Sequence, residues 1–232
     1  MRYNGHLCQS LIRIALVLIF TLGGGCASYE IKNLAKSDID LVADEAINTT
    51  RTLVRELLVK LYRRNPAELR KIPGMTLEMR LAQLRVNERE LVFEELKGKQ
   101  GIEAMNLAFD SAYTGDRVFA LISGLADMLR QAYGYKPEMF MLHQLNAEAL
   151  STSARNVEIL VWKLKQIRRP DGRPYLITHE RDGVIDNLSF ERLFGKMIAL
   201  QDLLAKVAAD VDDRLITTAV HTASTVFIPL PI

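Results

Sequence analysis

Five polar and aromatic residues are spaced so that two predicted helices would position them as a site. Arg155 and Glu158 are one helical turn apart, so they can form an ion pair on one face. Trp162 falls on the same face, and Glu191 and Arg192 open the last long predicted helix. Because buried charges must be paired, these residues predict either an ion-pair network or a docking site for a partner or a ligand.

Residues that commonly carry catalysis show no recognisable pattern in this sequence. His143 and His221 lie in predicted helices, and His179 lies in a charged loop where solvation is expected. None of them follows a glutamate by three residues, as di-iron helix bundles require, and the HExxH and G-x-S-x-G motifs are absent from the sequence. We therefore expect no catalytic residue, no metal ion and no cofactor, and we predict that the protein is not an enzyme.

Composition places the chain among globular proteins and excludes several classes. It has 232 residues, of which 49% are hydrophobic and 25% are charged. The formal net charge of +2 is too small for a strongly basic nucleic-acid-binding protein, so we expect no nucleic acid as a partner. The sequence contains only two cysteines, which excludes a disulfide framework and a cysteine-rich metal site.

Helical periodicity dominates residues 37–232 and predicts a single all-α, bundle-like domain. Asn65 is predicted to cap a short helix that begins at Pro66. The sequence RRPDGRP predicts a turn-rich loop, and a short strand is expected over residues 175–178. The longer helices are expected over residues 37–64, 76–84, 88–96, 102–113, 116–133, 137–145, 147–167 and 189–224.

Two of these helices differ in how their apolar residues are distributed. Residues 116–133 have one apolar face and a polar face containing Ser123 and Asp127, which predicts a helix on the surface of the bundle. Residues 147–167 have an apolar stripe, with Ile159 and Trp162 nearly opposite to it. Because a helix that is apolar on two sides is usually packed between neighbours, we expect 147–167 to be the central helix.

Two pairs of arginines stand where predicted helices end. Arg63 and Arg64 close the first long helix, and Arg168 and Arg169 begin the loop after the 147–167 helix. Each pair is expected to be solvated, with contact to anionic lipid headgroups as the alternative.

The N-terminal segment has the pattern of a targeting signal. Arg2 and Arg13 precede or border the apolar run IALVLIFTL, which is followed by three glycines and Cys26. This order of basic, apolar and small residues is typical of a secretory signal peptide. The apolar run has roughly half of the ~20 residues that a helix needs to cross a bilayer, so we expect no lasting transmembrane anchor.

The end of this segment resembles the cleavage motif of bacterial lipoprotein signal peptides, on the residues Leu22-Gly23-Gly24-Gly25-Cys26. The resemblance implies that residues 1–25 are removed and that Cys26 becomes the first residue, carrying palmitate-type acyl chains that anchor the protein to a membrane. Residues 26–36 would then be the lipidated N-terminus and a tether. Ala27 implies the outer membrane rather than the inner one, with the domain facing the periplasm. A secretory signal followed by a chance cysteine is the alternative.

Removal of the signal peptide would change the net charge and the number of cysteines of the chain. Residues 1–25 hold Arg2 and Arg13 but no acidic residue, so the 30 basic and 28 acidic residues become 28 of each. Cys8 is also removed, which leaves Cys26 as the only cysteine. No disulfide can form within such a chain, so packing alone must stabilise the fold.

The sequence ends in an apolar tail, TVFIPLPI, over residues 225–232, where two prolines favour an extended backbone. The tail either packs in a groove of its own domain or forms a docking patch that a partner or the membrane covers. The apolar residues of the tail are Val226, Phe227, Ile228, Leu230 and Ile232.

These features favour a lipid-anchored envelope protein that acts as a scaffold or accessory subunit of a membrane or secretion assembly, with another envelope protein as its partner. The alternative is a helical carrier of lipid or another apolar ligand, and the third hypothesis is an enzyme acting on the cell wall or on lipids. A scaffold predicts an exposed apolar patch, and a carrier predicts a closed apolar cavity. An enzyme predicts a cleft containing a histidine or carboxylate with a shifted pKa.

Overall fold

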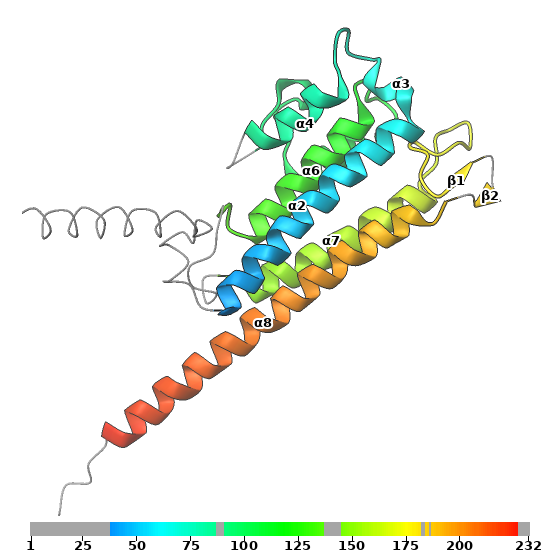
Figure 1. Cartoon of the computed structure of the whole chain (residues 1–232). Helices are drawn as coiled ribbons and strands as arrows, with labels where there is room; N and C mark the ends of the chain where they lie inside the picture. Colours follow the sequence, from blue (N-terminus) through cyan, green and yellow to red (C-terminus); the bar gives the residue numbers. More distant parts are fainter. Residues whose placement is uncertain (1–37, 87–90, 137–144, 182–183, 186, 227–232) are drawn as a thin grey trace, which may run out of the picture. The chain divides into compact units, whose positions relative to one another are not determined.

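Helix α6 (Arg117–Ala132) lies at the centre of an all-α domain in the computed structural model, which describes residues 38–86, 91–136, 145–181, 184–185 and 187–226 (Figure 1). The predicted fold class is therefore confirmed. Five other helices, α2 to α5 and α7, contact α6, and α8 packs along α2 and α7. The remaining elements are α2 (Asp38–Arg64), α3 (Pro66–Leu69), α4 (Leu77–Val86), η2 (Glu94–Leu96), α5 (Gly101–Leu107), α7 (Ala147–Gln166), β1 (Glu180–Arg181), β2 (Val184–Ile185) and α8 (Ser189–Val226).

The prediction that residues 116–133 form a surface helix is wrong. Every residue of α6 from Arg117 to Leu129 is buried. Ser123 is 1% exposed and donates a hydrogen bond to the Ala120 carbonyl, and Asp127 accepts one from the Leu91 backbone N–H at 3.2 Å. The polar face can be buried because these side chains find hydrogen-bond partners inside the protein.

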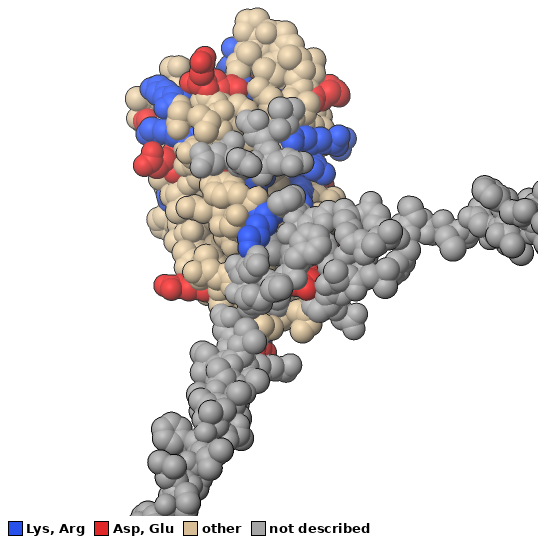
Figure 2. Space-filling view, turned by 90° about the vertical axis from the view of Figure 1, so that its left-hand side faces the viewer, with Lys and Arg blue, Asp and Glu red and all other residues tan. Residues whose placement is uncertain are grey.

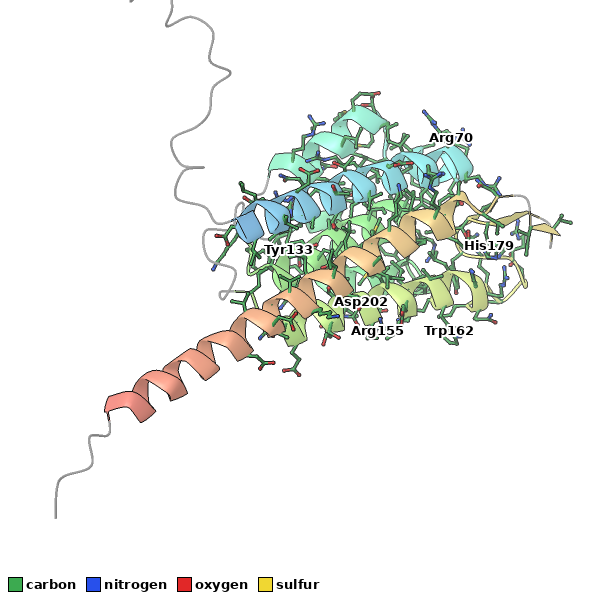
Figure 3. All side chains as sticks on the ribbon, turned by 60° about the horizontal axis from the view of Figure 1, so that its bottom comes forward. Arg70, Tyr133, Arg155, Trp162, His179 and Asp202 are labelled. Atoms are coloured by element: carbon green, nitrogen blue, oxygen red, sulfur yellow. The ribbon has the colours of Figure 1, made fainter. Side chains whose placement is uncertain are left out.

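The complementary prediction, that residues 147–167 form the central helix, is also wrong. Only the main stripe of α7 is buried, and its second apolar face is open to solvent, with Ile159 50% and Trp162 57% exposed. Two apolar residues do not make a continuous stripe that a neighbouring helix could cover. α7 therefore lies at the edge of the bundle, where Trp162 is on its outer side (Figure 3).

Several predicted helix ends are confirmed. The Asp116 side chain caps α6 by accepting a hydrogen bond from the Phe119 N–H at 3.0 Å, and Asn146 caps α7 in the same way. α6 ends at Ala132, and Gly134 follows the C-cap Tyr133 with a positive φ of 62°, which suits glycine just after a helix C-terminus.

Other boundaries differ from the prediction. Residues 91–93 are irregular and only the turn η2 follows them, so the described part of the helix expected over 88–96 is not α-helical. α5 ends at Leu107 instead of continuing to 113. The buried Arg117 guanidinium donates hydrogen bonds to the carbonyl oxygens of Leu107, Ala108 and Asp110, which a continuing helix would use for its own backbone hydrogen bonds. No strand forms over 175–178; the antiparallel pair β1–β2 follows it. The helix expected over 137–145 lies almost wholly outside the described residues.

One buried amide joins four helices at the middle of the bundle. Gln201 of α8 is fully buried and donates hydrogen bonds to the hydroxyl of Tyr133, beside the end of α6, and to Thr50 of α2. Its carbonyl oxygen accepts a hydrogen bond from Ser153 of α7 at 3.2 Å. Because an unpaired amide would be costly here, this cluster favours one packing arrangement of the helices.

A second buried cluster attaches α4 and η2 to the rest of the domain. Arg80 of α4 is fully buried and binds Glu95 with two nitrogens, at 2.5 and 2.8 Å, and Asp116 at 3.1 Å. Tyr62 of α2 donates a 2.6 Å hydrogen bond to the same Asp116 carboxylate. The Arg80 guanidinium also lies 3.8 Å from the centre of the Phe119 ring. Asp116 thus serves both as the cap of α6 and as the acceptor that holds α2 and α4 together.

Three buried tyrosines predict that the protein loses stability in alkaline solution. Burial raises the pKa of Tyr62 and of Tyr133, and it raises the pKa of Tyr113 to about 12. In the unfolded chain a tyrosine ionises near pH 10, so the unfolded state releases protons that the folded state retains. The stability present below pH 10 is therefore lost as the pH rises towards 12, by up to about 1.4 kcal/mol per pH unit for each tyrosine.

Urea unfolding followed by circular dichroism, at about pH 8 and at a series of values up to about pH 11.5, measures this loss. Tyr62→Phe removes one of the three groups and should make the decline of the unfolding free energy shallower above pH 10. A free energy that stays level across this range would contradict the assignment.

α8 is much longer than the helices beside it. Its 38 residues span about 57 Å, whereas the 20 residues of α7 span about 30 Å. The C-terminal part of α8 therefore extends beyond the ends of α2 and α7 (Figure 1). Among the residues that the structure describes, no helix combines the length and apolar character needed to cross a bilayer.

Candidate functional site

The predicted ion pair between Arg155 and Glu158 is confirmed, at 2.8 Å. Arg155 also pairs with Asp202 of α8 at 3.1 Å, so the group links α7 to α8 (Figure 3). These side chains are roughly half exposed, and exposed pairs contribute only about 0–1 kcal/mol. This is a surface contact between two helices and not a buried network.

The other residues of the predicted site lie elsewhere. Glu191 pairs with Lys165 at 3.2 Å and lies 3.9 Å from Nδ1 of His179. His179 is 8% exposed, so the expectation that it is solvated is wrong, since the loop folds back and places it beside Glu191. Arg192 is exposed on α8. The five residues therefore do not form one site.

The lipidation residue and most of the apolar tail fall outside the described residues. Cys26 belongs to this group, as do Phe227, Ile228, Leu230 and Ile232. The backbone of α8 continues to Val226, so the first two positions of the predicted extended tail are helical.

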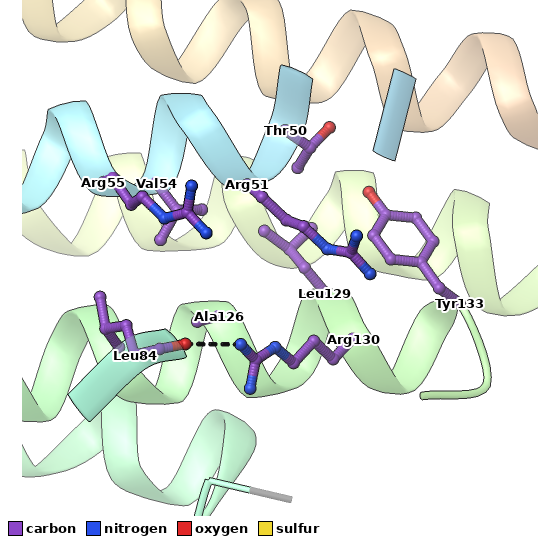
Figure 4. Close-up of a pocket in the computed structure, with 9 residues that line it drawn as sticks. All are labelled: Thr50, Arg51, Val54, Arg55, Leu84, Ala126, Leu129, Arg130 and Tyr133. Carbon is purple, nitrogen blue, oxygen red and sulfur yellow. Dashed lines mark hydrogen bonds between the residues drawn. The ribbon is translucent and has the colours of Figure 1, made fainter. Parts of the chain in front are cut away.

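Charges of both signs are scattered over the face of the molecule shown in Figure 2, among larger areas of uncharged residues. A small pocket between α2, α4 and α6 gathers Arg51, Arg55 and Arg130 over an apolar floor (Figure 4). Its cavity volume is only about 30 Å³, which is room for about two water molecules. Arg130 closes one side by donating a 2.6 Å hydrogen bond to the Leu84 carbonyl. This pocket is too small for a ligand.

A larger open cleft lies where the end of α2 and the start of α3 face the 168–177 loop. Its volume is about 720 Å³, within the range of small-molecule sites. Four arginines and two carboxylates line it, together with apolar residues that include Pro66, Tyr175 and Ile177. The arginines are Arg64, Arg168, Arg169 and Arg173.

Asn65 holds the two sides of this cleft together. Its side-chain amide donates to the Ile177 carbonyl at 2.9 Å and accepts from the Ile177 N–H at 2.8 Å. Asn65 was expected to cap α3, but its side chain makes no capping hydrogen bond there. The amide instead pairs with the loop backbone as a neighbouring strand would, which fixes the loop against the end of α2.

The loop forms the predicted turn. The Arg169 N–H bonds to the Arg173 carbonyl at 2.8 Å, and the Gly172 N–H bonds to the Arg169 carbonyl at 2.9 Å. Gly172 has a φ of 82°, a conformation that favours glycine. The turn places the arginines of the loop beside Arg64, which is far from them in the sequence.

The Tyr175 ring anchors the loop at the base of the cleft. Tyr175 is 7% exposed, and the guanidinium groups of Arg117 and Arg169 lie over its ring at 4.9 and 5.7 Å from the centre. Burial lowers the pKa of Arg117, and the positive charge of Arg169 lowers it further. Two cations on one aromatic ring stack favourably with it but repel each other.

Sequence reasoning identified the two basic pairs but not the cleft. Arg63 is exposed, whereas Arg64, Arg168 and Arg169 are each partly buried in the lining of the cleft. The turn-forming sequence and the arginines on both sides of it could have predicted a basic loop. Nothing in the sequence indicated that this loop contacts Asn65.

Comparison with known proteins identifies no family for this chain. No protein-family model matches the chain, and searches of curated proteins and of solved structures found no similar protein. Within the described residues, no three histidine, cysteine or acidic side chains gather as metal ligands would.

Proposed function

We propose that this protein is a lipid-anchored scaffold or accessory subunit of an envelope assembly, attached to the outer membrane through Cys26 and facing the periplasm. The observation that carries the proposal is the extension of α8 beyond its neighbours (Figure 1). Helices in proteins gain most of their stability from tertiary packing of one face. The 13 residues of α8 after Asp213 therefore suit packing against another protein.

Exposed apolar residues at the other end of α8 support the same proposal. Val184, Ile185 and Leu188 are 66%, 62% and 64% exposed, and they lie on or directly after the β1–β2 pair. Scattered single apolar residues are ordinary on a surface, but neighbouring ones favour an interaction site. A carrier of apolar ligands would need a closed apolar cavity, whereas the 720 Å³ cleft is open and lined by arginines.

Native mass spectrometry of the full-length protein, extracted gently from its own membrane, tests the proposal. A partner protein in fixed stoichiometry is expected. A chain that ends after Asp213 should lose this partner while melting within a few degrees of the full-length protein, because Ala208 is the last buried residue among the α8 side chains that the structure describes. A protein that carries an additional lipid mass and no partner would indicate a carrier, and a protein with nothing bound would contradict both functions.

Cys26→Ser tests the anchor separately. Acyl chains contribute about 0.8 kcal/mol for each buried CH₂ group, so the loss of all of them should move the protein from the membrane fraction to the soluble periplasmic fraction. Cys8→Ser is the matched control and should leave the protein in the membrane fraction. Membrane retention of the Cys26→Ser protein would contradict lipidation at this residue.

A further inference from the structure

The surroundings of Arg169, in the lining of the large cleft, point to a missing anion. Its Nε is buried and makes no hydrogen bond within the described part of the chain. Its Nη2 donates to a neutral group, the Tyr175 carbonyl, at 3.0 Å. Arg169 is partly exposed towards the cleft, and the structure gives it no ion pair among the residues that it describes.

The two carboxylates of the cleft are already bound to other groups. Asp171 accepts three hydrogen bonds from Arg173, at 2.6 to 3.0 Å. Glu68 accepts from the Arg117 backbone N–H and from Lys71, both at 2.7 Å. Asp171 lies close enough to Arg169 for their opposite charges to attract, but the hydrogen bonds of both carboxylates go to other groups.

The position of Arg169 is nevertheless fixed. Its guanidinium lies over the Tyr175 ring, close enough to Arg117 for the two charges to interact unfavourably. The turn closed by Gly172 holds its backbone, and Asn65 holds the loop that carries Tyr175. A positive charge that is held in place beside another one is stabilised when an anion binds in front of it.

We infer that this cleft binds a phosphate-bearing ligand and that Arg169 contacts the phosphate. Guanidinium groups present paired N–H donors that match the oxygens of a phosphate. Four arginines and two carboxylates leave an excess of two positive charges in the lining. A phosphate monoester, with roughly −1.5 to −2 charges at pH 7, matches that excess more closely than a single carboxylate does.

Isothermal titration calorimetry with inorganic phosphate tests this inference on the full-length protein in detergent. Saturable binding at one site is expected in buffer of about 0.15 M ionic strength, where contacts to exposed charges are strongly screened. Arg169→Gln should weaken the binding by about tenfold or more, as the loss of a charge-assisted hydrogen bond implies. Arg169→Lys keeps the charge but not the paired donors, so it should weaken binding less, and it serves if the glutamine variant does not fold.

Arg155→Gln is the matched control. It removes the same charge from an arginine outside the cleft, where Arg155 pairs with Glu158 and Asp202, and it should leave the affinity unchanged within about twofold. The inference is overturned if phosphate does not bind saturably, or if the two glutamine variants lose affinity equally.

A comparison of two probes distinguishes the source of the phosphate. Glycerophosphoglycerol has the phosphodiester of an anionic lipid headgroup, and tighter binding of this compound than of inorganic phosphate would indicate a lipid. Tighter binding of inorganic phosphate or pyrophosphate would indicate a soluble ligand. Either preference supports a phosphate site, and neither depends on the proposed scaffold function.

Discussion

Replacing Arg80 by methionine is expected to lower the free energy of unfolding by about 3–5 kcal/mol, the range for breaking a buried ion pair from one side. Arg80 is fully buried, and its guanidinium is shared between Glu95 and Asp116. Burial alone would lower its pKa, but the hydrogen bond to Glu95 and the neighbouring negative charges raise it instead. Without Arg80, the buried Asp116 carboxylate keeps Tyr62 and the Phe119 N–H as its donors among the described residues.

The control for this variant is Arg155→Met. It makes the same chemical change at an arginine that also contacts two carboxylates, but here the ion pairs are exposed. We expect it to cost less than about 1 kcal/mol. Chemical denaturation of both variants measures the difference, and similar losses would show that burial of the Arg80 cluster contributes little.

Gly124→Ala is the second change with a large expected effect. Gly124 lies where α6 crosses the start of α5, and a Cβ atom there would meet the Gly101 carbonyl oxygen at 2.4 Å and the Met105 backbone nitrogen at 2.6 Å. These are backbone atoms, so α5 as a whole would have to move. We expect a loss of about 1–3 kcal/mol or more, as overpacking of a core causes.

Gly195→Ala makes the same substitution in α8, where nothing lies within 4 Å of the added Cβ atom. Alanine is a better helix former than glycine by up to about 1 kcal/mol, so this variant should be more stable than the parent. Thermal melts of the two proteins should therefore shift in opposite directions. Shifts of the same sign would contradict the close approach of α5 and α6 at Gly124.

Local features of the sequence were enough to predict the helical class and many of the elements. Asp116 and Asn146 act as caps because their short side chains accept hydrogen bonds from a helix N-terminus. The sequence around Gly172 forms a turn because glycine tolerates the positive φ that the turn requires. These contacts span only a few residues, so the sequence by itself determines them.

The arrangement of the helices was decided by the tertiary structure. The periodicity of a helix records how much of its surface is apolar but not which helices surround it. α6 could therefore become central with Asp127 buried, while Trp162 remained on an outer face of α7.

The candidate cleft likewise depends on contacts between distant segments. Asn65 meets Ile177, and Arg64 faces Arg169, only after α2 and α7 have packed into one bundle. The burial of Arg80 could not be predicted from the sequence either, because a charged residue in a helix is normally exposed unless the fold places charged partners beside it. The sequence determined the helices and their ends, and only the packing of those helices decided which charges became buried and which came together.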